Sequence, residues 1–92
     1  MKIYTVKDTI SGSFSTPFTC VNDDDMKRRI GFQNKDNPFA ADMQIFACAL
    51  WDEHLGLIHF FDDNSPLYVC TVKDCVDAFV GGYLSEVIPD EA

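Results

Sequence analysis

Four basic side chains in one short stretch are the residues of this chain best suited to bind an anion. They are Lys27, Arg28, Arg29 and Lys35. Cations of this kind hold a phosphate backbone, and aromatic rings beside them hold single-stranded nucleic acid by stacking on its bases. Phe32 lies within the basic stretch, and Tyr4 is a second candidate ring. The four cations are therefore the predicted nucleic-acid-binding residues.

The same cations have an alternative partner inside the chain. Asp23, Asp24 and Asp25 precede them, at spacings that place opposite charges on neighbouring turns of a helix. Under this alternative the stretch is a solvated helix face that neutralises its own carboxylates, and both interpretations stay open.

The charge of the whole chain does not favour nucleic acid. The net charge is -8. Residues 1–35 carry six basic and four acidic side chains, whereas residues 36–92 carry one basic and eleven acidic ones. An acidic domain repels nucleic acid at long range unless its cations gather on one face. Only the basic stretch could provide such a face.

Carboxylates and histidines also cluster around the middle of the chain, where a divalent metal site is conceivable. They are Asp52, Glu53, His54, His59, Asp62 and Asp63. Turns are rich in aspartate for reasons of backbone geometry, and a histidine in a strand usually satisfies a local hydrogen bond. We therefore predict no metal and no cofactor.

The remaining reactive side chains do not form a catalytic pattern. Cys20, Cys48, Cys70 and Cys75 lack the close pairs typical of zinc sites and are expected to be free, buried thiols. No serine or cysteine has a histidine and an acid in a recognisable arrangement, and no glycine-rich phosphate loop is present. The sequence does not predict an enzyme.

The stretch 42–63 organises the predicted fold. Apolar runs at 43–51 and 57–61 flank the polar tip Asp52-Glu53-His54, and Gly56 can close a hairpin turn. The first run is apolar at odd and at even positions, which predicts a strand in the middle of a sheet with both faces covered.

The other predicted strands and the two helices follow from helix-capping residues and from the periodicity of apolar residues. Strands are expected at 3–6 and 67–70, and an irregular extended segment at 14–21 is interrupted by Pro17. Residues 26–34 follow an Asn-Asp helix start, although Gly31 costs this helix about 1 kcal/mol relative to alanine. Thr71, with Asp74 three residues later, caps an amphipathic helix that ends at Gly81.

These elements predict an α+β fold with a small, mainly antiparallel sheet and two helices packed on one face. The length of 92 residues suits a single domain, 1–92, in which residues 83–92 form a tail that packs on the sheet, stays mobile or binds a partner. The apolar run 43–51 is too short to cross a bilayer, and no signal peptide is apparent, so we expect a soluble protein without a membrane partner.

The sequence also resembles a family, the small nonstructural proteins of gokushoviruses, which are single-stranded DNA phages of the Microviridae. The resemblance covers residues 1 to about 61. It rests on Met1 to Val6, Pro17-Phe18, Arg29, Phe32, Asn37-Pro38, Asp42, Asp52-Glu53, Gly56 and Ile58. The cysteine-bearing segment after Ser65 and the C-terminal tail match this family poorly.

The resemblance implies a non-enzymatic phage accessory protein of the host bacterial cytoplasm that is absent from the virion. It implies a link to genome replication or packaging and to single-stranded DNA, but it assigns no functional residue. The net charge of -8 favours an alternative, an acidic module that engages a host or phage protein without binding DNA. A homodimer is a further alternative to a monomer, because apolar residues of 51–61 and of the tail could bury against a second copy.

Overall fold

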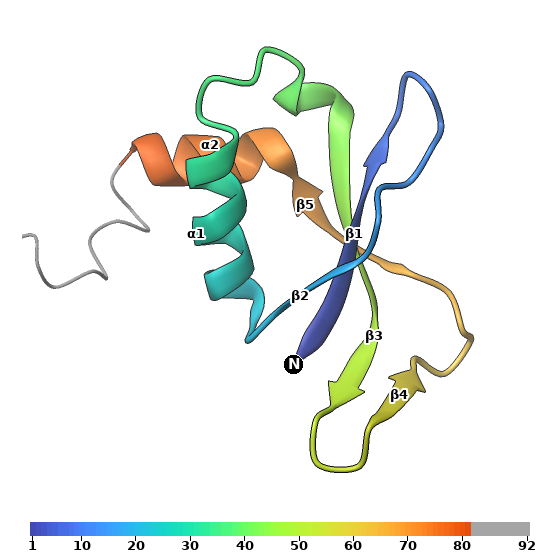
Figure 1. The fold of residues 1–92 in the computed structure, drawn as a ribbon. Helices are drawn as coiled ribbons and strands as arrows, with labels where there is room; N and C mark the ends of the chain where they lie inside the picture. Colours follow the sequence, from blue (N-terminus) through green and yellow to red (C-terminus); the bar gives the residue numbers. More distant parts are fainter. Residues whose placement is uncertain (82–92) are drawn as a thin grey trace, which may run out of the picture.

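Five antiparallel strands and two helices build residues 1–81, the part of the chain that this computed structural model describes (Figure 1). The strands are β1 (Lys2–Asp8), β2 (Phe18–Cys20), β3 (Met43–Asp52), β4 (Leu57–Phe60) and β5 (Leu67–Thr71). The helices are α1 (Asp23–Gln33) and α2 (Val72–Val80), with a short 3-10 turn, η1 (Ala40–Asp42), before β3. The predicted α+β fold is confirmed.

The long strand β3 lies at the centre of the sheet, as predicted. One edge of β3 pairs with β1, which in turn pairs with β2. The other edge is shared: Ala49–Asp52 pair with β4, and Gln44–Ala47 pair with β5. The hairpin of β3 and β4 therefore extends the sheet at one end, and Figure 1 shows it projecting away from the helices.

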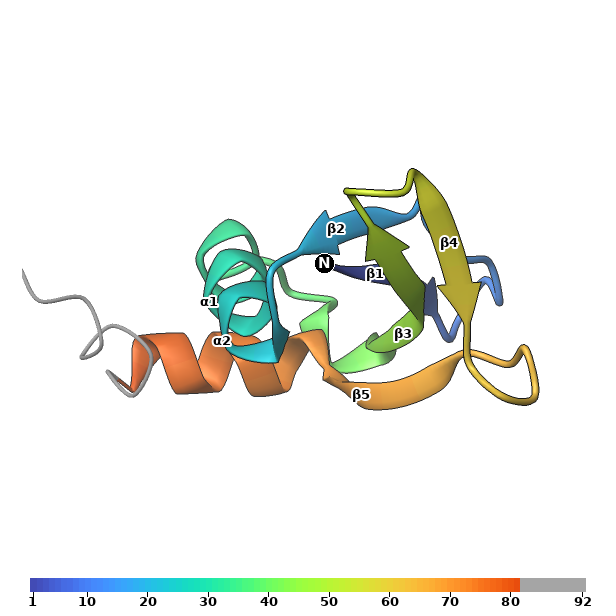
Figure 2. The same cartoon turned by 90° about the horizontal axis from the view of Figure 1, so that it is seen from below.

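The prediction that both faces of β3 are covered is wrong. Ile45, Ala47 and Ala49 are buried, whereas Phe46 is only partly buried and Leu50 is 42% exposed. The reason is the small number of elements, since both helices pack on the same face and, within residues 1–81, no second layer covers the other. Figure 2 shows α1 and α2 together on one side of the sheet. The outer face of the sheet is therefore accessible.

The predicted hairpin turn is confirmed. The backbone N–H of Gly56 donates to the carbonyl of Asp52 at 2.8 Å, and Gly56 has a φ of 68°, a conformation that glycine adopts without strain. The side chain of Asp52 accepts hydrogen bonds from the backbone N–H groups of His54 and Leu55. These two bonds lower the pKa of Asp52, the contribution of Leu55 being the larger.

The prediction of an irregular extended segment at 14–21 is confirmed. Only Phe18–Cys20 is a regular strand, and Phe14 makes a single bridge with Lys7. Between them the backbone N–H of Ser15 donates to the carbonyl of Val6 at 2.8 Å, but the N–H of Val6 donates to the Ser15 hydroxyl at 3.0 Å and not to a backbone carbonyl. This interruption precedes Pro17, which has no N–H to donate.

The caps predicted for both helices are present, but α1 begins earlier than predicted. Asn22 accepts the backbone N–H of Asp25 at 2.8 Å, so α1 starts three residues before the predicted 26–34 and ends at Gln33. At α2, the hydroxyl of Thr71 accepts the N–H of Asp74, while the Asp74 carboxylate accepts the N–H of Thr71, each at 3.0 Å. This reciprocal pair is a capping box.

The core lies between the helices and the inner face of the sheet. Its buried members are Tyr4, Cys20, Met26, Ile30, Ala40, Ile45, Ala47, Cys70, Val72 and Cys75. All four cysteines are free thiols; Cys48 is partly buried and the other three are buried. Within residues 1–81, no helix is both long and apolar enough to cross a membrane. The predicted tail, 83–92, lies outside the described residues.

Replacing Thr71 with alanine should lower the free energy of unfolding by about 1 kcal/mol, the usual cost of losing an N-cap side chain. For a domain of this size, this corresponds to a fall in Tm of about 4–8 °C. Thermal unfolding followed by circular dichroism would measure it. Thr71→Ser keeps the capping hydroxyl and should stay close to the wild type; an equal loss in both variants would contradict a capping role.

Candidate functional site

The predicted basic residues all lie on or directly after α1, but two of them bind a carboxylate of the same helix. Arg28 and Arg29 each approach the same oxygen of Asp25 at 3.3 Å. The pKa of Asp25 is lowered, first because the backbone N–H of Val21 donates to it and then because Arg29 and Arg28 lie beside it. The two arginines are thus placed as the alternative of internal neutralisation predicts.

The other two cations differ from each other in their surroundings. Lys27 is partly buried, whereas Lys35 is exposed and lies over the ring of Phe32, with its Nζ 4.9 Å from the ring centre. Phe32 is itself exposed and meets Phe79 of α2 edge to face. Lys35 and Phe32 therefore remain accessible for an anionic or aromatic ligand.

Tyr4 is not available for base stacking. Its ring is fully buried and stacks on Phe18, and its hydroxyl donates a hydrogen bond to Asp23. Lys2 donates to the same carboxylate at 3.0 Å. Burial and the neighbouring Asp23 raise the pKa of Tyr4, while the hydrogen bond from Tyr4 lowers the pKa of Asp23. Tyr4 joins β1 to the start of α1 and takes no part in an exposed surface.

The charges around α1 cancel. Residues 22–36 contain four basic and four acidic side chains, which leaves no net charge. The Asp25 side chain is only 13% exposed, whereas the side chains of Arg28 and Arg29 are 42% and 55% exposed, so both arginines share one largely buried carboxylate while parts of both side chains stay in contact with solvent. The segment nevertheless offers no excess of positive charge to a phosphate backbone.

The outer face of the sheet carries a second candidate surface that the sequence reading missed. Phe14, Phe46 of β3 and Tyr68 of β5 form a row across the sheet, with 5.8 Å between neighbouring ring centres. Phe14 is 51% exposed and Tyr68 is 55% exposed. Lys7 of β1 lies at one end of this row, with its Nζ 5.6 Å from the Phe14 ring centre. We call these four residues the aromatic row.

Carboxylates are absent from the strands around the aromatic row, except at strand ends. Asp8 is the last residue of β1 and Asp52 the last of β3, and β2, β4 and β5 contain none. The acidic side chains of the described residues lie in the helices, in the turns and at these strand ends. The strong net negative charge is thus displaced from the surface that holds the exposed rings.

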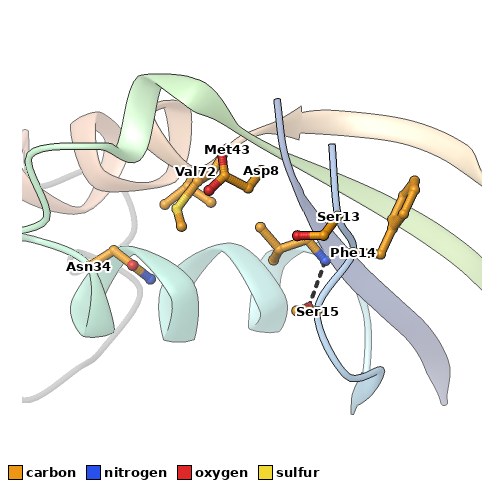
Figure 3. A pocket seen from close by; sticks show the side chains of 8 residues that line it. Asp8, Ser13, Phe14, Ser15, Asn34, Met43 and Val72 are labelled. Carbon is orange, nitrogen blue, oxygen red and sulfur yellow. Dashed lines mark hydrogen bonds between the residues drawn. The ribbon is translucent and has the colours of Figure 1, made fainter. Parts of the chain in front are cut away.

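A shallow hollow of about 260 Å³ lies between the segment 13–15 and the adjoining ends of α1 and α2, with Val6 and Asp8 of β1 also in its lining (Figure 3). Phe14, Ser13 and Ser15 line one side, and Asn34, Met43 and Val72 line the other. Pockets that bury drug-sized ligands usually measure about 300–1,000 Å³. The hollow is therefore too small and open to favour a small-molecule site.

The predicted cluster of carboxylates and histidines comes together only in part, since Asp52, Glu53, His54 and His59 line one open hollow whose lining does not include Asp62 or Asp63. Asp52 and His59 approach each other to 3.7 Å. Within the described residues, no three side chains of His, Cys, Asp or Glu are arranged to hold a metal ion.

Comparison with known proteins gives a family but no closer relative. No curated protein and no solved structure matches the chain. The family model described as Phage ORF5 protein matches residues 1–75, well over half of the 92 residues, from β1 into α2. This chain is therefore a phage protein that belongs to the Phage ORF5 protein family.

Proposed function

We propose that this phage accessory protein binds single-stranded DNA through the aromatic row on the outer face of its sheet. The observation that carries the proposal is the row itself: exposed Phe14 and Tyr68 flank Phe46, and Lys7 lies beside the Phe14 ring. Stacking of one base on an aromatic side chain is worth about 1–3 kcal/mol and does not depend on sequence. Two exposed rings could therefore hold a strand of any sequence with modest affinity.

Because few cations lie at the aromatic row, the affinity of this binding should depend only weakly on salt. Lys7 is the basic member of the aromatic row, and the nearby segments 9–22 and 43–51 contain no charged side chain. Binding that neutralises one or two phosphates has a slope of about -0.7 to -1.4 in a plot of log affinity against log salt. Binding by the four cations at α1 would have a slope near -2.8 by the same rule.

The proposed biological setting is the one that the gokushovirus resemblance implies. The protein would act in the host bacterial cytoplasm, outside the virion, at the stage where single-stranded genomes are replicated or packaged. It would act by binding and without catalysis.

Replacing Phe14 and Tyr68 together with alanine should weaken binding of a fluorescent 12-nucleotide dT oligomer by about 30-fold or more, since each ring contributes one stacked base and the two together are worth at least about 2 kcal/mol. Fluorescence anisotropy at low salt would measure the affinity, and circular dichroism would show whether both proteins are folded. The matched comparison is the triple variant Lys27→Ala, Arg28→Ala, Arg29→Ala, which should retain most of the affinity.

Two outcomes would count against this proposal in different ways. Loss of binding in the triple variant alone, with a salt slope near -3, would move the DNA site to α1. No binding by the wild type at low salt would end the DNA hypothesis and leave the protein-binding alternative, for which the exposed strand β4 is the structural support.

A further inference from the structure

The strand β4 forms an edge of the sheet, at the end farthest from the helices. Within residues 1–81, β4 pairs with β3 and with no other strand. Many proteins protect such an edge with lysine, proline or a bulge, because unpaired backbone groups accept further strands. A short strand is also a protection, and β4 has only four residues, but Leu57-Ile58-His59-Phe60 contains no lysine or proline and its pairing with β3 has no bulge. The edge of β4 is therefore open to an added strand.

The backbone contacts of Trp51 show which groups of β4 face outward. Trp51 uses both its N–H and its carbonyl for Met1, at 2.7 and 3.2 Å, on the β1 side of β3. Trp51 is opposite Ile58, so this is a pair without hydrogen bonds between β3 and β4. The N–H and carbonyl groups of Ile58, and of Phe60 two residues later, consequently point away from β3.

The side chains of β4 are exposed on both faces of the hairpin. Leu57 and Ile58 are each 50% exposed and Phe60 is 63% exposed. Leu50 of β3 and Leu55 of the turn are also exposed and extend this apolar surface. An added strand would find unpaired backbone groups together with apolar side chains to pack against.

Acidic residues stand at both ends of this edge. Asp52 and Glu53 precede β4 at the turn, and Asp62 and Asp63 follow it, whereas residues 54–61 contain no carboxylate. About five residues of extended chain, or about 17 Å, separate the two acidic ends. This charge pattern is complementary to a peptide that is apolar in the middle and basic at both ends.

We propose that the edge of β4 binds, as an added strand, an extended segment of a partner protein with about five largely apolar residues flanked on both sides by lysine or arginine. A second copy of this chain fits the edge less well. In a symmetric pair of antiparallel β4 strands, Asp52 and Glu53 of one copy would meet Asp62 and Asp63 of the other, and like charges at an interface are costly. The proposal is independent of DNA binding, because it concerns a different surface.

Two synthetic peptides of equal length test the proposal with the full chain. The probe is Lys-Lys-Val-Thr-Val-Thr-Val-Lys-Lys, and its matched control replaces each lysine with glutamate. The probe should bind at least tenfold more tightly than the control, and the difference should shrink as salt increases. Hydrogen exchange measured by NMR should show new protection of the Ile58 and Phe60 amides, while the amides of Leu57 and His59 stay unchanged.

A charge-reversed protein gives the strictest comparison. Glu53→Lys, Asp62→Lys and Asp63→Asn together should reverse the preference, so that the glutamate peptide binds better. These residues are exposed and lie in turns, so circular dichroism should show an unchanged fold. Asp52 is left in place because its side chain holds the turn, and Asp63→Asn keeps the side-chain oxygen that accepts the Ser65 N–H.

Three results would overturn the proposal. Equal binding of the two peptides would exclude charge selection. Binding without protection of Ile58 and Phe60 would exclude strand addition. Protection of these amides that rises with protein concentration, in the absence of peptide, would identify a second copy as the occupant.

Discussion

Replacing Gly31 with alanine should lower the free energy of unfolding by about 2 kcal/mol, although alanine is the better helix former by about 1 kcal/mol. A Cβ atom at this position would lie 2.5 Å from the carbonyl oxygen of Cys75 and 2.9 Å from the Cβ of Phe79. Neither contact can be relieved by turning a side chain, because both belong to α2 near its backbone. The two helices would have to separate, and core packing would be lost.

Thermal unfolding of Gly31→Ala should therefore show a Tm about 8–16 °C below that of the wild type. Gly56→Ala is the matched control, because its φ is positive but no atom lies within 4 Å of an added Cβ. The control should lose less stability than Gly31→Ala and should keep the contact between the helices. A Gly31→Ala protein as stable as the wild type would show that α1 and α2 pack less closely than described.

Replacing Tyr4 with alanine should lower the free energy of unfolding by about 3–5 kcal/mol, the usual cost of removing a buried aromatic ring. The ring is fully buried against Phe18, and its hydroxyl is bonded to Asp23. Tyr4→Phe keeps the ring and removes only the hydrogen bond to Asp23. It should lower the free energy of unfolding by about 1–2 kcal/mol, the lower part of the range for a hydrogen bond to a charged group, because the Asp23 side chain is 40% exposed. Chemical denaturation of the three proteins would separate packing from the hydrogen bond.

The pH dependence of these proteins identifies the hydrogen bond. The folded-state pKa of Asp23 is lowered, chiefly by the hydrogen bond from Tyr4. The ionised Asp23 therefore adds to the free energy of unfolding at pH values above its unfolded pKa of about 3.9, and this stabilisation is lost as the pH falls through the folded-state pKa. The gap between wild type and Tyr4→Phe should therefore narrow below pH 4. A raised pKa of Tyr4 should make the wild type lose stability above pH about 10, a loss that Tyr4→Phe avoids. A constant gap at all pH values would contradict the Tyr4–Asp23 bond.

The proposed DNA-binding and peptide-binding surfaces lie at different places on the molecule and differ in their charge. The aromatic row lies on the outer face of the sheet, where the strands carry carboxylates only at their ends. The edge of β4 lies between two acidic ends. Salt would weaken peptide binding at β4 through four carboxylates, whereas it would weaken DNA binding at the row only slightly. The two activities can therefore be measured separately in one protein.

Local sequence signals predicted the elements whose causes are local. The Asn22 and Thr71 caps, the turn closed by Gly56 and the pairing of Asp25 with Arg28 and Arg29 each involve residues no more than four positions apart. Hydrogen bonds and ion pairs over such distances depend on the local backbone, which the residue types largely determine. The central place of β3 also followed from its apolar composition.

The tertiary structure decided the surfaces and the close contacts. Phe14, Phe46 and Tyr68 lie 32 and 22 residues apart in the chain, and strand pairing alone brings their rings together. Alternation along β3 shows which residues share a face, but only the packing of both helices on one side leaves the Phe46 face open. The need for glycine at position 31 is also set by the tertiary structure. Glycine disfavours α1 locally, but a Cβ atom at this position would lie too close to α2. The sequence showed which residue types could bind a ligand, and the tertiary structure determined which of those side chains are accessible.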